Sequence, residues 1–203
     1  MSFWDERYDV PGLLFGEAPN AFLQSQAKLL EPGWQALSLA DGEGRNGIWL
    51  AEQGLQVHAL DASSVALEKA KAWARQRGMD VRFEYADLLD WHWPEAGYDL
   101  VAAIFIQFAG PDGRKRMFDG IRRALKPGGL LILQGYTPRQ LEYRTGGPPA
   151  VENMYTQALL KESFGDWETL HLLEHDDFIA EGSGHHGQSA LIDLVARKPV
   201  PAG

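Results

Sequence analysis

Residues 37–47 read LSLADGEGRNG, a short apolar run that ends in a glycine-rich turn. The apolar run predicts a β-strand, and the residues after the turn, with Ile48, Trp49 and Leu50 on one face, predict a helix. Glycine permits such a tight connection because it adopts backbone conformations that other residues rarely reach. A strand, a glycine turn and a helix are typical of α/β domains, although a lone Gly-x-Gly is weak evidence of nucleotide binding.

Outward from this turn, apolar runs alternate with amphipathic stretches. We expect parallel strands at residues 37–40, 56–60, 81–85, 100–106 and 130–133, because this alternation is typical of βαβ units. Helices are predicted over 64–77, capped by Ser63 or Ser64, and over 114–125, ended by the Lys-Pro-Gly-Gly of residues 126–129. Residues 168–174 and 189–196 predict an antiparallel pair.

The predicted fold class is therefore α/β, a Rossmann-like, doubly wound, mostly parallel seven-stranded sheet with an antiparallel edge hairpin at the C-terminus. With 203 residues, of which 45% are hydrophobic, we expect one domain over 1–203. A net charge of −9 argues against nucleic acid as a partner. We see neither a signal peptide nor a membrane span and expect a cytoplasmic protein. Because there is no cysteine, disulfides and zinc–thiolate sites are excluded.

Two acidic residues follow the predicted strands at the edge where α/β sheets bind ligands. Asp61 comes about 20 residues after the glycine turn and can accept both hydrogen bonds from a ribose diol; its alternative role is to cap the next helix. Asp87 follows the third strand, where an adenine amino group would lie. The glycine turn and Asp61 alone also fit a nicotinamide-dependent Rossmann oxidoreductase, but Asp87 and the Lys-Pro-Gly-Gly turn argue against it.

In this order, the motifs of residues 35–134 resemble the class I S-adenosylmethionine-dependent methyltransferases. The resemblance implies S-adenosyl-L-methionine as the cofactor. It places the cofactor's methionine part against the glycine loop, its ribose beside Asp61, its adenine beside Asp87 and its methyl group above the end of strand four. The implied cofactor-binding residues in this region are Ala40, Gly42, Gly44, Asp61, Ala62, Asp87, Leu88 and Ile104.

Two positions depart from the pattern of this family. The family usually has an acid where this chain has Ser38, and often a glycine where it has Ala40. Asp41 or Glu43 is the alternative source of negative charge near the ammonium group of the cofactor.

Beyond the shared core, the chain is similar to the tellurite-resistance-like branch of small-molecule methyltransferases. The similarity rests on FWDERY and FGEAPN in residues 3–20, EGRN at 43–46, YTPRQ at 136–140 and GGP at 146–148. It implies that residues 1–20 form an N-terminal lid segment over the cofactor, with Arg7 and Tyr8 near its carboxylate. The alternative is an exposed N-terminal arm. Residues 136–150 are expected to form a substrate-side loop.

The predicted catalytic residue is His185, in a glycine-flanked loop expected between the last two strands, at a position where the similar branch tends to carry a histidine. An oxygen or nitrogen acceptor needs a general base, whereas a soft acceptor such as a thiolate or metalloid does not. Tyr136, Arg139 and Arg144 are the predicted substrate residues, because arginines can attract an anionic acceptor. His175, Asp176 and Asp177 lack the spacing of a known metal site, so we expect no metal.

The sequence therefore predicts a methyltransferase that moves a methyl group from S-adenosylmethionine to a small-molecule acceptor, such as a thiol, a metalloid oxyanion or a metabolite. The alternatives are the nicotinamide-dependent oxidoreductase and a non-catalytic S-adenosylmethionine-binding protein. Expected partners are the small-molecule methyl acceptor alone, with no nucleic acid and no membrane, in a monomer or homodimer.

Overall fold

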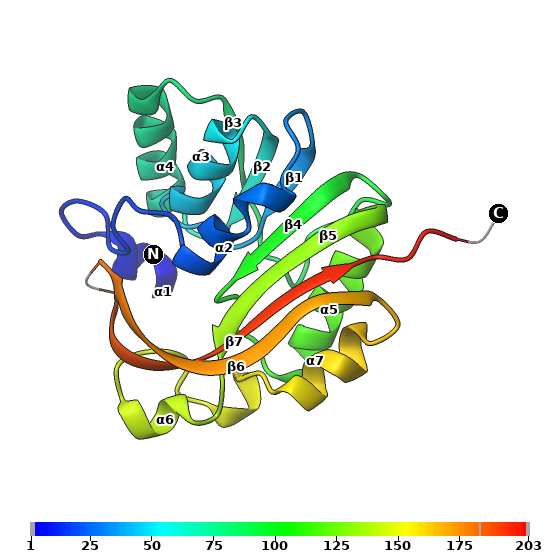
Figure 1. The fold of residues 1–203 in the computed structure, drawn as a ribbon. Coiled ribbons are helices and arrows are strands. Elements are labelled where there is room, and N and C mark those ends of the chain that lie inside the picture. The colour runs from blue at the N-terminus through cyan, green and yellow to red at the C-terminus, as the bar shows by residue number, and fades with distance from the viewer. Residues whose placement is uncertain (1–2, 183, 202–203) are drawn as a thin grey trace.

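A seven-stranded sheet with helices on both faces organises the chain (Figure 1). The computed structural model describes residues 3–182 and 184–201. The strand order is β3-β2-β1-β4-β5-β7-β6; the first five strands pair in parallel and the last two antiparallel. The bounds are Gln35–Ser38 for β1, Gln56–Asp61 for β2, Val81–Tyr85 for β3, Tyr98–Ile104 for β4, Leu125–Tyr136 for β5, Glu168–Glu181 for β6 and His185–Arg197 for β7. This topology confirms the predicted fold class.

Alternating side chains of the strands divide the core between the two faces of the sheet. On one face, Ala36, Leu100 and Ile132 pack with residues of α2 (Ala21–Ser25) and α3 (Arg45–Glu52). On the other, their neighbours Leu37 and Val101 pack with residues of α5 (Pro111–Ala124) and α7 (Gln157–Phe164). The remaining helices are α1 (Phe3–Tyr8), α4 (Ser64–Arg77), α6 (Gln140–Tyr143) and the short 3₁₀ turns Ala27–Leu29 and Val151–Asn153.

Two parallel strands end earlier than predicted because the chain turns into a left-handed conformation. β1 ends at Ser38, and Ala40 follows with φ +47°. β4 ends at Ile104, and Phe105 follows with φ +55°. Positive φ is uncommon for residues with a Cβ atom and concentrates at functional sites. Both turns lie at the ligand-binding edge of the sheet.

The C-terminal hairpin is much longer than predicted. Glu181 pairs with His185, and position 183 between them lies outside the described residues. The expectation of a loop holding His185, His186 and Gly187 was wrong, because these residues begin β7. Near Glu181 and His185 the sequence is polar and glycine-rich, yet β6 and β7 still pair there. β5 ends at Tyr136, opposite Leu191, so this part of the hairpin extends beyond β5.

The end of this hairpin that extends beyond β5 lies next to the N-terminal segment (Figure 1). The Gly184 amide donates to the Leu14 carbonyl at 3.1 Å. Residues 1 and 2 of the predicted lid lie outside the described residues. The rest of this segment includes a helix, α1, which packs against α4. The predicted substrate-side loop likewise begins inside β5 and contains α6.

Within residues 3–182 and 184–201, no helix combines the length and the apolar character needed to cross a bilayer.

Candidate functional site

A cavity of about 560 Å³ opens at the carboxyl ends of the parallel strands. It lies where the strand order changes between β1 and β4, the position at which α/β sheets bind ligands. Its walls come from the turns after β1 to β4, from α1 and Phe15, from Tyr136 at the end of β5 and residues 147–149 after it, and from the start of β7. The predicted site residues that line it are Arg7, Tyr8, Ala40, Asp61, Ala62, Asp87, Leu88, Ile104, Tyr136 and His185.

Asp61 ends β2 with a carboxylate that backbone amides hold in place. Its Oδ2 accepts from the Gly42 amide at 2.7 Å and its Oδ1 from the Ser63 amide at 2.8 Å. The helix cap itself is Ser63, whose hydroxyl accepts from the Ala66 amide. Burial raises the pKa of Asp61 to about 6 despite these amides. The carboxylate is thus fixed in the wall of the cavity with lone pairs to offer to hydroxyl groups.

Asp41 brings a second buried carboxylate to the cavity from the glycine turn. The Ser38 hydroxyl donates to its Oδ1 at 2.6 Å, and the Gly47 amide donates to the same oxygen at 3.0 Å. Burial raises the pKa of Asp41 to about 7. Glu43, the other residue considered for this charge, instead pairs with Lys69 at 3.0 Å and does not line the cavity.

The glycines of the turn act through close packing. A Cβ atom on Gly42 would lie 2.5 Å from the Tyr8 hydroxyl oxygen, so only glycine lets α1 approach this closely. Gly44 has φ +92°, and a Cβ there would lie 3.0 Å from the Ala70 side chain. Neither glycine is among the cavity-lining residues. Burial, followed by the charges of Asp61 and Glu43, raises the pKa of Tyr8, which keeps its phenol neutral.

At the far end of the same edge, Asp87 follows β3. Its Oδ1 accepts from the Leu89 amide at 2.9 Å, and its side chain remains exposed at the mouth of the cavity. Leu88 next to it is buried. This pair offers an acceptor and an apolar surface to a flat polar ring.

The opposite end of the cavity is aromatic. Phe105 stacks on Tyr136 with ring centroids 4.7 Å apart. The His185 ring lies 4.7 Å from Phe105 and 4.5 Å from Phe15. Gln107 steadies this wall, because its amide donates to the Tyr136 carbonyl and accepts from the Tyr136 amide at 2.6 Å. Sequence reasoning missed Gln107, which no local pattern marks.

His185 belongs to a buried charged cluster that sequence reasoning also missed. Its Nδ1 lies 3.6 Å from the Glu181 carboxylate. Glu181 in turn pairs with Arg45 at 2.7 Å, and both of these side chains are largely buried. The sequence signal for Arg45 was its place in the EGRN motif, whereas Glu181 fell in a stretch interpreted as a loop. Two distant parts of the chain, α3 and the β6–β7 hairpin, thus meet beside the cavity.

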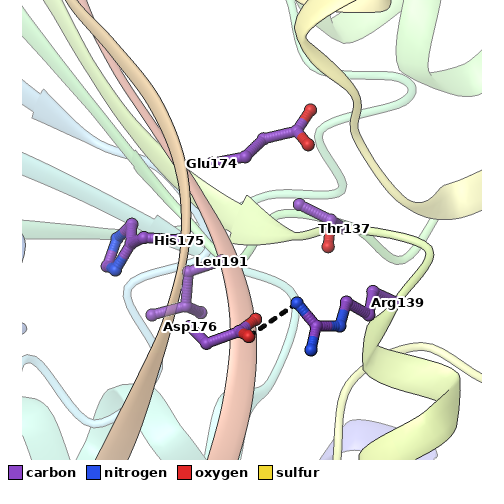
Figure 2. A pocket seen from close by; sticks show the side chains of 6 residues that line it. All are labelled: Thr137, Arg139, Glu174, His175, Asp176 and Leu191. Atoms are coloured by element: carbon purple, nitrogen blue, oxygen red, sulfur yellow. Dashed lines mark ion pairs between the residues drawn. The ribbon is translucent and has the colours of Figure 1, made fainter.

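Two predicted substrate residues lie outside this cavity. Arg139 lines a separate cavity of about 300 Å³, where its guanidinium pairs with Asp176 at 2.7 Å (Figure 2). His175 in the same wall contacts Asp193 at 2.7 Å. Arg144 is exposed just after α6. Arg139 already has an anionic partner, and neither arginine lines the main cavity. Neither is therefore placed to draw an anion into it.

Comparisons with known proteins agree with this geometry. Residues 36–129 match a family model described as a methyltransferase domain. An uncharacterized methyltransferase of Synechocystis sp. is 31% identical over 105 residues, which cover 51% of this chain and 48% of that protein. The chain thus spans about half the length of that relative.

A relative from Mycobacteroides abscessus aligns over more of the chain. It is a 2-heptyl-1-hydroxyquinolin-4(1H)-one methyltransferase, 26% identical over 190 residues that cover 88% of this chain and 80% of that protein. TehB from Haemophilus influenzae has a similar fold, with a TM-score of 0.71 at 17% identity over 97% of this chain and 66% of that one. In its methyltransferase-domain match over residues 36–129, its strand order and its acidic strand ends, the chain is similar to the class I S-adenosylmethionine-dependent methyltransferases.

Proposed function

We propose that this protein transfers the methyl group of S-adenosylmethionine to a hydroxyl or ring nitrogen of a small planar aromatic molecule. The observation that carries the proposal is the acceptor end of the cavity, where Phe105, Tyr136 and Phe15 surround the His185 ring. Aromatic walls of this kind bind flat apolar ligands and exclude water.

The residues at the other end fit the cofactor. Asp41 is a buried carboxylate for which the described part of the chain provides no cation within ion-pair distance, so an ammonium group suits it. Asp61 can accept from both ribose hydroxyls, and Asp87 with Leu88 suits the adenine ring. Arg7 is available to the cofactor's carboxylate. When bound, the cofactor supplies a methyl group on a cationic sulfur, which takes the electron pair of the breaking carbon–sulfur bond.

The charge of the cavity favours a neutral acceptor over a metalloid oxyanion. The arginines among the described lining residues are Arg7 and Arg45. Arg45 is paired with Glu181, and Arg7 is assigned to the cofactor. An oxyanion would therefore enter a site without a free cation. The relative from Mycobacteroides abscessus, whose name specifies a hydroxylated quinolone ring, supports an aromatic acceptor here.

His185 is the base in this proposal. Burial lowers its pKa, so the ring is neutral near physiological pH and can accept a proton from the acceptor's hydroxyl. The walls of the cavity would orient the acceptor toward the methyl group of a bound cofactor, and such alignment can supply much of the rate enhancement of a displacement. A thiolate acceptor is already ionised and would not need this base.

Two experiments test the proposal. S-adenosylmethionine and S-adenosylhomocysteine should raise the melting temperature while NAD and NADP should not, since a ligand bound only by the native state stabilises it. Stabilisation by NAD alone would contradict the cofactor assignment.

The acceptor class is tested with labelled methyl groups. Purified protein is incubated with hydroxyquinolones and simple phenols, with alkyl thiols, and with tellurite and selenite. Label should enter the aromatic compounds, and His185→Gln should cut this transfer about 10²–10⁴-fold while leaving cofactor affinity unchanged. Efficient transfer to tellurite, unaffected by His185→Gln, would contradict both the acceptor class and the base.

A further inference from the structure

One ring nitrogen of His185 is buried in an unusual state. In the part of the chain that the structure describes, Nδ1 has no hydrogen-bond partner. The nearest charged atom recorded for it is Glu181 Oε2 at 3.6 Å, just beyond hydrogen-bond distance. The exposed fractions of the two side chains are only 13% and 11%, so water does not readily replace the missing partner. A buried polar atom left in this way calls for an explanation.

Two side chains hold the Glu181 carboxylate in place. Arg45 donates to Oε2 at 2.7 Å, and Asn20 donates to Oε1 at 3.0 Å. Asn20 is itself fixed, because its amide also donates to Gln134 in β5 at 2.6 Å. Burial acts to raise the pKa of Glu181, but its interactions with His185 and Arg45 prevail and lower it to about 2. The carboxylate therefore stays ionised and faces Nδ1.

We infer that Glu181, clamped by Arg45 and Asn20, is a positioning residue that keeps the proton of neutral His185 on Nδ1. The inference rests on the proposed function, in which His185 is the base. A proton on Nδ1 is attracted to the Glu181 carboxylate, whereas a lone pair on Nδ1 would be repelled by it. Nε2 then carries the lone pair that the acceptor's proton needs.

The step balances without any further reactant. The proton of the acceptor's hydroxyl moves to Nε2, the oxygen's electron pair forms the bond to the methyl carbon, and sulfur takes the pair of the bond that breaks. The imidazolium then donates from Nδ1 to Glu181, which keeps its charge throughout. Closing the 3.6 Å separation to a hydrogen bond at this moment stabilises the charge as it develops.

Other charged and titratable groups around the ring make this anion necessary. Arg45 on α3 and Arg7 on α1 both disfavour the imidazolium, as does burial, while Glu181 on β6 favours it. Tyr136 on β5 lies edge-on to the ring with centroids 5.9 Å apart, and burial raises the pKa of its phenol, which leaves it neutral. Without Glu181, a protonated His185 would face the guanidinium groups of Arg45 and Arg7 and would lose this anion.

The first test uses the unaltered protein and needs no acceptor. Nitrogen-15 NMR of the histidine side chains distinguishes the two neutral tautomers, and His185→Gln identifies the signal among the 6 histidines. Above the pKa of the ring, we expect the tautomer protonated at Nδ1. A ring protonated at Nε2 overturns the inference, and because no turnover is measured, this outcome is separate from a failure of the proposed function.

The second test removes the charge of Glu181. Glu181→Gln should shift the tautomer signal, lower the pKa of His185, move the acidic limb of the kcat profile to lower pH and reduce kcat about 10²-fold. The affinity for S-adenosylhomocysteine should not change. If Arg45 without its partner prevents folding, the double variant Arg45→Gln, Glu181→Gln removes both charges and keeps the tautomer readable.

Glu168→Gln is the matched control, since Glu168 lies on the same strand with an exposed side chain. It should leave the tautomer and the kcat profile as in the parent. If Glu181→Gln lowers the melting temperature but leaves tautomer, pKa and kcat profile unchanged, Glu181 is structural only and the inference is wrong.

Discussion

Asp41 lies in the glycine turn and lines the cavity where we propose that the methionine part of the cofactor binds. The family usually carries that acid at the position of Ser38. Here the Ser38 hydroxyl donates to Asp41 at 2.6 Å, so the short side chain supports the carboxylate instead of supplying it. In the proposed site, the acid that is missing at Ser38 is supplied three residues later, within a single turn.

Ala40 gives the first prediction at the scale of single residues. Its φ of +47° disfavours a Cβ atom, which costs about 1–2 kcal/mol, whereas the added freedom of glycine in the unfolded chain costs about 0.4–1 kcal/mol. Ala40→Gly should therefore raise the free energy of unfolding in urea by up to about 1 kcal/mol. The control Ala36→Gly, in regular β1, should lower it. A loss of stability at both positions would show that Ala40 is unstrained.

Asp61 and Asp87 give the second prediction. Asp61→Asn should weaken binding of S-adenosylhomocysteine, because charged hydrogen bonds to the ribose are worth roughly 1.5–3 kcal/mol each. The variant also disturbs the amides of Gly42 and Ser63, which the carboxylate now holds. Asp87→Asn should cost less, since an amide oxygen still accepts from the adenine amino group. Calorimetric affinities that fall equally in both variants would mean that the two roles are misassigned.

At the scale of elements, α1 and the β6–β7 hairpin close the cavity from two sides. The hairpin packs into the apolar core through residues such as Ile179 and Leu191, whereas α1 is attached largely by polar contacts. Lys69 on α4 carries much of this attachment, because its ammonium donates to the carbonyls of Tyr8, Val10 and Gly12 and pairs with Glu43. One side chain thus ties the end of α1 to the body of the domain.

Lys69→Met should therefore loosen the lid more than the fold. If the closed lid falls to about a tenth of the population, the affinity for S-adenosylmethionine falls about tenfold. Hydrogen exchange of residues 3–14 should rise, with the core strands unaffected. Lys71→Met is the control, since Lys71 lies on the same helix and pairs only with exposed Glu68 among the described residues. Equal effects of both variants on affinity would contradict the role of Lys69.

At the scale of the whole molecule, the net charge of −9 and the two buried carboxylates both make the folded state less stable as pH rises. Asp41 and Asp61 have pKa values near 7 and 6 in the folded chain, against 3.8 for an ordinary aspartate. Between these values the folded state binds more protons than the unfolded state. The free energy of unfolding must then fall as pH rises through this range.

We predict that the ligand-free protein loses stability between about pH 4 and pH 7, with a slope of up to about 1.4 kcal/mol per pH unit for each group. Glu181 acts oppositely, because its lowered pKa contributes stability that disappears only in stronger acid. Urea unfolding at a series of pH values measures this. Asp41→Asn should flatten the upper part of the slope, and exposed Asp177→Asn should not. A parent protein that gains stability over this range would refute the prediction.

The sequence by itself determined the parallel core, the glycine turn and the two acids at strand ends. Each is marked by a local pattern, because a parallel strand is a buried apolar run and the residues that follow it lie at the ligand-binding edge. The fold class and the family were predictable for that reason. Ser63 and Ser64 were the two predicted candidates for a helix cap on the same local grounds, and the cap is Ser63.

Only the tertiary structure decided the surroundings of His185. Its strand is extended by pairing with β6, and neither polar stretch shows the apolar alternation that would reveal it. Arg45 and Glu181 meet across 136 positions of the chain, and Gln107 reaches Tyr136 across 29. Arg139 pairs with Asp176 on β6 instead of lining the main cavity. Local patterns record which face a residue buries, but charged pairs form wherever the folded backbone brings opposite charges together out of water, and that depends on the whole chain.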